Sequence, residues 1–347
     1  MPFFSLSTGR EINFVFLHPK TSALTSLDQI KAPIDEQIRV FEDSFRDYLK
    51  TPVPLLNTIM RYIVRRKGKQ MRPMFVFLSA GVCGTINPGT FHAASLIELL
   101  HTATLVHDDV VDDSNLRRGF FSINAIWKNK IAVLVGDFLL SRGMLLALEH
   151  DEFDLLKMVS NAVREMSEGE LLQIEKARRL DIEEQIYFEI IRKKTATLIA
   201  SCCACGALSA KTDPGRIKAM WDFGENTGIA FQIKDDLFDY DRSLNTGKPS
   251  GTDIRDQKMT LPLIYLLNHS GSADKRRIIN TVKNYPDNAG RVAELIRMVA
   301  DSGGIDYARQ KMVEYRQKAI DILRTFPENQ YRNSLEALVV FTTERNK

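Results

Sequence analysis

The sequence contains little cysteine and no strong excess of charge of either sign. Only four of its 347 residues are cysteines, three of them within residues 202–205, and none forms a Cys-x-x-Cys pair. This scarcity argues against a disulfide framework and favours a reducing, cytoplasmic location. The net charge of +3, from 47 Lys and Arg against 44 Asp and Glu, is too small and too evenly mixed for a nucleic-acid-binding protein.

Membrane-spanning and secretory segments are not expected either. The best candidate for a span, residues 197–210, has only about 14 residues and contains Ser and Cys, so we interpret it as a buried core helix. The N-terminus has no basic region followed by a long apolar run, which argues against a secretory signal. Residues 1–24 show no clean periodicity. We predict a loosely ordered arm there, followed by one domain over residues 25–347.

Helical periodicity is present along almost the whole chain. From about Leu27 onward, apolar residues recur every three or four positions, and Pro or Gly turn signals separate the runs. No segment alternates convincingly as a strand would. After a first helix over 30–45, the predicted helices cover residues 53–66, 71–83, 89–112, 121–149, 152–169, 182–210, 215–240, 259–268, 273–284, 289–302, 305–325 and 329–344. The expected fold is therefore all-α, a single bundle of roughly a dozen helices around a central cavity.

Two Asp-Asp-x-x-Asp motifs each follow an apolar helical run, over residues 108–112 and 235–239. Their aspartates are Asp108, Asp109, Asp112, Asp235, Asp236 and Asp239. Residues four apart share one helix face, where like charges repel, so this spacing gains nothing unless a cation binds. Carboxylates suit Mg²⁺, which commonly combines one or two of them with substrate phosphates. One motif alone could be a solvated helix end, but two matching motifs favour a metal site.

Basic residues surround these motifs. Lys69 and Arg72 flank the start of a predicted helix after a glycine-containing turn, a natural phosphate site. Lys194 interrupts an apolar helix, so its charge needs a partner. His101 lies two turns before Asp108 on roughly the same face, and a satisfied core histidine is the alternative there. Apart from Lys194, any one of these basic residues alone would be interpreted as a solvated surface charge and not as a phosphate ligand.

Taken in order, these motifs resemble those of the trans-isoprenyl (polyprenyl) diphosphate synthases, especially the long-chain octaprenyl and heptaprenyl members. The resemblance covers roughly residues 27–347 and rests on segments 67–73, 99–113, 117–119, 135–137, 194–196 and 231–240. It implies the isoprenoid-synthase fold and a homodimer. It also implies a condensation in which an allylic diphosphate ionises and isopentenyl diphosphate attacks the allylic cation. Loss of a proton to the departing diphosphate then gives a product diphosphate five carbons longer.

The resemblance further implies roles for individual residues. The six aspartates would bind magnesium, with three ions per active site when diphosphate is bound. Isopentenyl diphosphate would bind to Lys69, Arg72, His101 and Arg118. The allylic diphosphate would bind to Arg117, Lys194, Thr195, Gln232, Lys248 and Lys258. Thr195 and Gln232 would lie beside the cationic carbon, and Gln70 stands where the family often has a third cation.

Product length is expected to depend on the helix ahead of Asp108. Short-chain members carry a bulky aromatic four or five residues before this position, whereas Thr104 and Ala103 are small. This predicts a long-chain all-trans product beyond C20, suited to quinone side chains, with transient membrane contact during its release. The alternatives are a short-chain farnesyl or geranylgeranyl diphosphate synthase, a class I terpene cyclase and a non-catalytic synthase subunit. The complete second aspartate motif argues against the last two.

Overall fold

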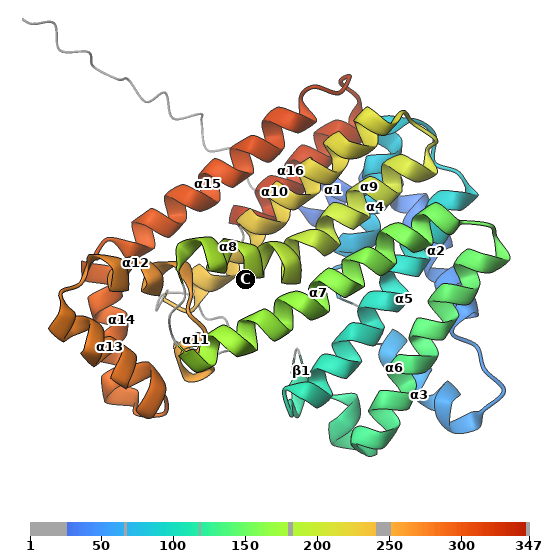
Figure 1. Ribbon diagram of the computed structural model, residues 1–347. Helices are drawn as coiled ribbons and strands as arrows, with labels where there is room; N and C mark the ends of the chain where they lie inside the picture. The colour runs from blue at the N-terminus through green and yellow to red at the C-terminus, as the bar shows by residue number, and fades with distance from the viewer. Residues whose placement is uncertain (1–25, 66–67, 118, 180–182, 241–250, 345–347) are drawn as a thin grey trace, which may run out of the picture.

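The chain forms a layered bundle of helices, seen in a computed structural model that describes residues 26–65, 68–117, 119–179, 183–240 and 251–344 (Figure 1). The predicted arm over residues 1–24 lies outside the described residues. The first half contains α1 (Leu27–Lys31), a 3₁₀ turn (Ala32–Ile34), α2 (Asp35–Tyr48), α3 (Pro54–Val64), α4 (Met71–Cys83), α5 (Pro88–Val111), β1 (Leu116–Arg117), β2 (Phe120–Phe121), α6 (Ile123–Glu149) and α7 (Phe153–Arg179). The second half contains α8 (Glu184–Ile191), a π segment (Arg192–Ala196), α9 (Thr197–Ser209), α10 (Pro214–Phe238), α11 (Thr252–Arg255), α12 (Leu261–His269), α13 (Ser272–Asn284), α14 (Ala289–Asp301), α15 (Gly304–Leu323) and α16 (Gln330–Glu344).

The two central helices that carry the aspartate motifs begin at defined caps. Asn87 and Thr90 form a capping box at the start of α5, and Pro88 occupies its first turn. Asp213 accepts a hydrogen bond from the backbone of Arg216 at the start of α10. The helix starts predicted near residues 89 and 215 are therefore confirmed, and Pro88 and Pro214 lie in the first turns of the two helices.

The predicted all-α fold is confirmed, with local differences. Helix α4 coincides with the predicted residues 71–83, but α7 continues to Arg179 instead of ending near residue 169. The single helix predicted over 182–210 is divided by the π segment. The antiparallel pair β1–β2 and the four-residue helix α11 were not predicted, because such short elements show no periodicity.

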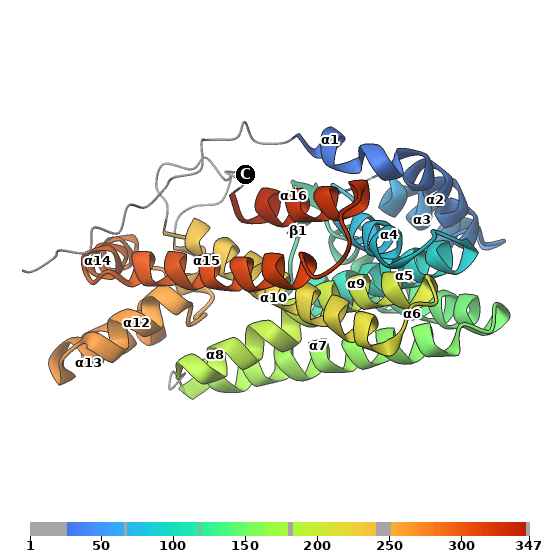
Figure 2. The ribbon, with the colours of Figure 1, turned by 90° about the horizontal axis from the view of Figure 1, so that it is seen from above.

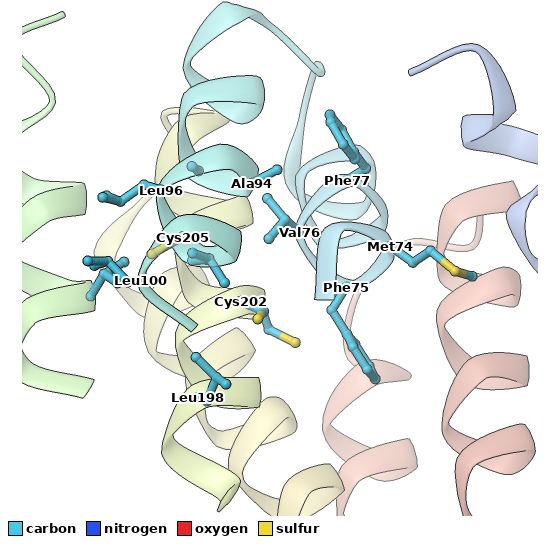
Figure 3. Packing of buried hydrophobic residues seen from close by; sticks show 14 of the residues in the cluster. Met74, Phe75, Val76, Phe77, Ala94, Leu96, Leu100, Leu198, Cys202 and Cys205 are labelled. Atoms are coloured by element: carbon cyan, nitrogen blue, oxygen red, sulfur yellow. The ribbon is translucent and has the colours of Figure 1, made fainter. Parts of the chain in front are cut away.

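The core is built around α4, α5 and α9. Every residue from Pro73 to Cys83 of α4 is buried, so other helices surround this helix on all sides. Figure 3 shows side chains of the three helices in one packed region, including Val76, Ala94 and Cys205. A second buried cluster joins α8 and the C-terminal half of α10 to α12, α14 and α15. Helix α10 runs beside α15 in both ribbon views (Figures 1 and 2) and links the two clusters.

The expectation that no segment is long and apolar enough to span a bilayer is wrong for α6. With 27 residues, it reaches that threshold by length and composition, and 39% of its most apolar window is buried. Asp137 and Arg142 interrupt the apolar sequence, and Arg142 donates a hydrogen bond to the Tyr48 carbonyl over 2.9 Å. Its backbone also departs from helical geometry at Lys128, where φ is 73°.

Candidate active site

A cavity of about 530 Å³ lies among α4, α5, α7, α9 and the π segment. Among the described residues, the Lys, Arg, Asp and Glu side chains of its lining are Lys69, Arg72, Glu98, Asp108, Glu170 and Lys194. Its apolar walls include Phe75, Leu198, Ile199 and Phe231. A cavity that combines a few charged side chains with an apolar wall suits a ligand that has an anionic head and a hydrocarbon tail.

The first aspartate motif ends α5 at this cavity. Burial raises the pKa of Asp108 to about 6, and Glu170 adds to the rise while Lys194 and Arg117 oppose it. Asp109 is only 4% exposed and accepts a hydrogen bond from Nε of Arg117 over 2.7 Å. Asp112 is exposed at the end of the helix. The three aspartates therefore occupy different environments, and Asp108 is the one that lines the cavity.

The π segment presents Lys194 and Thr195 to the cavity. Single π turns inside helices often occur at functional sites because they reorient side chains. Lys194 pairs with Glu170 of α7 and contacts Gln173 Oε1 at 3.4 Å. The prediction that the Lys194 charge has a partner is therefore confirmed.

Two glycines allow neighbouring helices to approach the π segment. If Gly228 of α10 had a Cβ, it would lie 2.4 Å from Cα of Ala196. A Cβ on Gly169 of α7 would lie 3.0 Å from the backbone nitrogen of Lys194. These contacts are with backbone, so a side-chain rotation would not relieve them. The backbone of the π segment therefore packs directly against the backbones of α7 and α10 at these two glycines.

The second aspartate motif is connected to the cavity by hydrogen bonds. The Thr195 hydroxyl donates to Gln232 Oε1 over 2.7 Å, and Gln232 Nε2 donates to Asp236 Oδ1 over 2.9 Å. The Tyr187 hydroxyl of α8 donates to the other oxygen of Asp236 over 2.7 Å. Burial and repulsion from Asp253 raise the pKa of Asp236 to about 7, although both donors oppose the rise.

Asp239 joins the end of α10 to α11. Its carboxylate accepts hydrogen bonds from the backbone nitrogens of Thr252 and Asp253, over 2.8 Å and 3.2 Å. Burial, followed by repulsion from Asp253, raises its pKa to about 6. The pKa of Lys258 is also raised: burial lowers it, but the charges of Asp253, Asp256 and Asp112 outweigh burial. Because Asp112 raises the pKa of Lys258, the first aspartate motif interacts electrostatically with the segment that follows the second motif.

The basic turn before α4 forms another side of the cavity. Arg72 donates to both carboxylate oxygens of Glu98, through Nε over 3.0 Å and Nη2 over 3.1 Å. Lys69 Nζ lies 5.4 Å from the centre of the Phe341 ring. Gln70 has a left-handed φ of 51°, which turns the chain sharply into the helix.

Comparison with known proteins identifies the family. A family model described as Polyprenyl synthetase matches residues 53–299. The chain belongs to the polyprenyl synthetase family. A relative from Rhodobacter capsulatus, named all-trans-nonaprenyl-diphosphate synthase (geranyl-diphosphate specific), is 35% identical over 327 residues, covering 93% of this chain and 99% of the relative.

Solved structures of polyprenyl synthetases agree with this family and fold. A decaprenyl diphosphate synthase from Rhodobacter capsulatus matches with a TM-score of 0.88 and 30% identity, covering 93% of this chain and all (100%) of that one. A polyprenyl synthase from Caulobacter crescentus, crystallised with calcium and isoprenyl diphosphate, matches with a TM-score of 0.86 and 32% identity, covering 94% of this chain and 100% of that one. The predicted resemblance is therefore confirmed.

The polyprenyl synthetase cavity gathers part of the predicted site. The predicted residues that line it are Lys69, Arg72, His101, Thr104, Asp108, Lys194 and Thr195. The other described candidates are not in its lining: Ala103, Asp109, Asp112, Arg117, Gln232, Asp235, Asp236, Asp239 and Lys258. Arg118 and Lys248 lie outside the described residues. Through Thr195, however, Gln232 and Asp236 are joined to the cavity.

Several polar residues of the site were not predicted. They are Glu98, Glu170, Gln173, Tyr187 and Asp253. Each contacts or electrostatically perturbs a predicted residue that is distant in the sequence. No spacing signal within one helix could have revealed them.

The aspartates fit a divalent cation that is shared with substrate. In the described parts of the chain, no three His, Cys, Asp or Glu side chains converge to form a metal site by themselves. Burial and neighbouring carboxylates nevertheless raise the pKa values of Asp108, Asp236 and Asp239, so each charged form would gain from a nearby cation. Magnesium bound by one or two carboxylates and phosphate oxygens suits this donor set.

Proposed function

We propose that the protein is a magnesium-dependent prenyltransferase that condenses isopentenyl diphosphate onto an allylic diphosphate to make long-chain all-trans polyprenyl diphosphate. The observation that carries this proposal is the cavity in which Asp108, Lys194 and Thr195 face the basic turn at Lys69 and Arg72. Such a cavity can hold two anionic groups beside an apolar wall. Membership of the polyprenyl synthetase family supports the same reaction.

In this reaction the difficult step is the separation of a diphosphate from an allylic cation. Bound magnesium would stabilise the negative charge that develops on the leaving diphosphate. Lys194, and Arg117 held by Asp109, add fixed positive charge on the same side. The Thr195 hydroxyl oxygen and the Gln232 carbonyl provide negative dipole ends for the developing cation. Phe231, Leu198 and Ile199 exclude water, which would otherwise quench that cation.

Isopentenyl diphosphate is assigned to the opposite, basic side. Arg72 has two of its donors occupied by Glu98, which fixes the guanidinium plane and leaves further N–H groups for phosphate oxygens. Lys69 and His101 line the cavity beside it. Arg118 and Lys248 stay predicted ligands of the two diphosphates. The six motif aspartates are proposed to hold up to three magnesium ions, with Asp109 also holding Arg117.

A long product is supported by the residues ahead of Asp108 and by the long-chain relatives. Thr104 lines the cavity and is small, so the helix ahead of Asp108 presents no bulky side chain at this position. Relatives named nonaprenyl and decaprenyl diphosphate synthases match almost the whole chain. We therefore favour a long-chain synthase, acting in the cytoplasm, over a farnesyl or geranylgeranyl diphosphate synthase.

The proposed homodimer would cover the exposed apolar face of α6. Val133, Leu134, Met144, Leu145 and Leu148 of this helix are each 42–55% exposed. Exposed apolar side chains gathered on one helix often mark an interaction site, although exposed Asp137 and Ser141 lie between the two groups here. A Leu145→Glu variant should shift the sedimentation coefficient from that of a dimer to that of a monomer.

The proposed reaction is tested by incubating the purified protein with farnesyl diphosphate, isopentenyl diphosphate and Mg²⁺ and sizing the products. We expect products beyond C20 and no turnover in EDTA. Asp108→Ala and Asp235→Ala should each lower turnover by several orders of magnitude while circular dichroism stays helical, because losing a like charge does not destabilise the metal-free helix. Normal turnover in EDTA would contradict the proposal, as would inactivity caused only by unfolding.

A further inference from the structure

Tyr187 is a buried tyrosine that belongs to neither aspartate motif. It lies on α8 and is 3% exposed, and its hydroxyl donates a hydrogen bond to Oδ2 of Asp236 over 2.7 Å. Asp236 is on α10 and is itself only 7% exposed. The contact therefore joins two helices in the interior, where a hydrogen bond to a carboxylate is strong and directional.

Each of the two carboxylate oxygens of Asp236 has its own protein donor. Oδ2 accepts from Tyr187, and Oδ1 accepts from Gln232 Nε2 over 2.9 Å. Gln232 is in turn held by the Thr195 hydroxyl over 2.7 Å. Because both oxygens have a protein donor, rotation of the carboxylate would break at least one of these bonds. Each oxygen still has lone-pair capacity for a further partner.

We propose that Tyr187 is a positioning residue for the second aspartate motif: it holds the Asp236 carboxylate in the orientation from which it binds magnesium. This inference rests on the proposed magnesium-binding role of that motif. Partners that orient a metal ligand commonly change metal affinity or activity by about 10–100-fold when they are removed. Loss of the Tyr187 hydroxyl would therefore change the magnesium dependence of the enzyme and leave its overall folding intact.

The Tyr187→Phe variant removes the hydroxyl and keeps the aromatic ring. The ring packs edge-on against Phe188 with centroids 5.4 Å apart, and phenylalanine can make the same contact. Tyr307→Phe is the matched control, since the Tyr307 hydroxyl donates to Glu184, also on α8, over 2.7 Å. Glu184 has no assigned role in catalysis or substrate binding.

Two measurements separate positioning from packing. The first is turnover against Mg²⁺ concentration, with KM values for both diphosphates. The second is the rise in melting temperature caused by Mg²⁺ with inorganic diphosphate, taken relative to each variant without ligand. This difference cancels any change in intrinsic stability and requires no turnover.

For Tyr187→Phe we expect the half-saturating Mg²⁺ concentration to rise roughly tenfold or more, with partial recovery of turnover at high Mg²⁺. The melting-temperature rise should shrink, and the KM for isopentenyl diphosphate should stay near that of the wild type. Tyr307→Phe should match the wild type in both assays. Wild-type magnesium dependence in Tyr187→Phe, or an equal change in both variants, would overturn the positioning role. Full turnover in Asp236→Ala would instead overturn the proposed metal site itself, and the two failures are therefore distinguishable.

Discussion

The buried charge of Asp236 predicts that a substitution at this site stabilises the metal-free protein. Its pKa rises from 3.8 to about 7 in the fold, first because of burial and then because Asp253 repels its charge. Between these two values the folded state binds a proton that the unfolded chain does not. The contribution of this group to stability therefore falls as the pH rises from about 4 to about 7. Above that range the folded protein carries the full unfavourable charge.

The size of this effect follows from the difference in pKa. One pH unit corresponds to about 1.4 kcal/mol, so roughly three units correspond to an energy on the order of 4 kcal/mol at pH 8. Asp236→Asn removes the charge and keeps the side-chain volume. Its amide group can accept a good hydrogen bond from only one of the two donors, Tyr187 and Gln232, which costs about 1 kcal/mol. The metal-free variant should therefore gain on the order of 3 kcal/mol in unfolding free energy at pH 8.

Urea unfolding in EDTA at pH 8 and pH 5 measures this difference. The gain should be large at pH 8 and small at pH 5, where Asp236 of the folded wild type is mostly protonated. Asp287→Asn, at an exposed position, is the control and should leave unfolding unchanged. If Asp236→Asn is no more stable than the wild type at pH 8, or if its gain is the same at both pH values, the buried-charge argument fails.

Other perturbations test the diphosphate site, the product tunnel and the packing of the π segment. Lys69→Ala should raise the KM for isopentenyl diphosphate by roughly tenfold in steady-state assays and leave that for the allylic primer nearly unchanged; the reverse pattern would exchange the two diphosphate sites. Thr104→Tyr, at the small position that lines the cavity, should shorten the main product to about the farnesyl or geranylgeranyl level, and chromatography that still shows the wild-type length would contradict the proposed product tunnel. Gly228→Ala should lose about 1–3 kcal/mol of unfolding free energy and part of the turnover, because its Cβ meets the backbone of the π segment. Gly290→Ala, inside α14, would bring its Cβ no nearer than 3.4 Å to a neighbour and should lose neither quantity; an equal loss in both glycine variants would refute the packing argument.

The fold could be predicted largely from apolar periodicity, and its failures have local causes. The last ten residues of α7 were missed because the apolar stripe fades into polar and charged residues between Gln173 and Arg179. The π segment was missed because five residues are too few to distinguish one hydrogen-bond spacing from another. The apolar character of α6 was overlooked because Asp137 and Arg142 divide its sequence. Periodicity thus locates helices well and describes their irregularities poorly.

The candidate site was predictable only where its residues form local patterns. The aspartate motifs and Lys194 are conspicuous within their own helices. Tyr187 is an ordinary apolar-face residue in the sequence, and its partner Asp236 is 49 positions away. Glu98 is likewise 26 positions from Arg72. Such pairs are created by helix packing, so they become visible only when the helices are placed together.

The charge balance of the cavity explains why these unpredicted acids matter. Of the described lining residues, Lys69, Arg72 and Lys194 are the Lys and Arg side chains, and Glu98, Asp108 and Glu170 are the acidic ones. Among the described residues, the Lys and Arg charges of the lining are therefore balanced by its Asp and Glu charges before any diphosphate binds. Glu98 and Glu170 fix the geometry of Arg72 and Lys194 but also offset their charge. Further attraction for a polyanion would therefore come from outside this lining. Predicted ligands such as Arg117 and Arg118 would contribute, and a divalent cation held by the aspartates would add positive charge where the diphosphate binds.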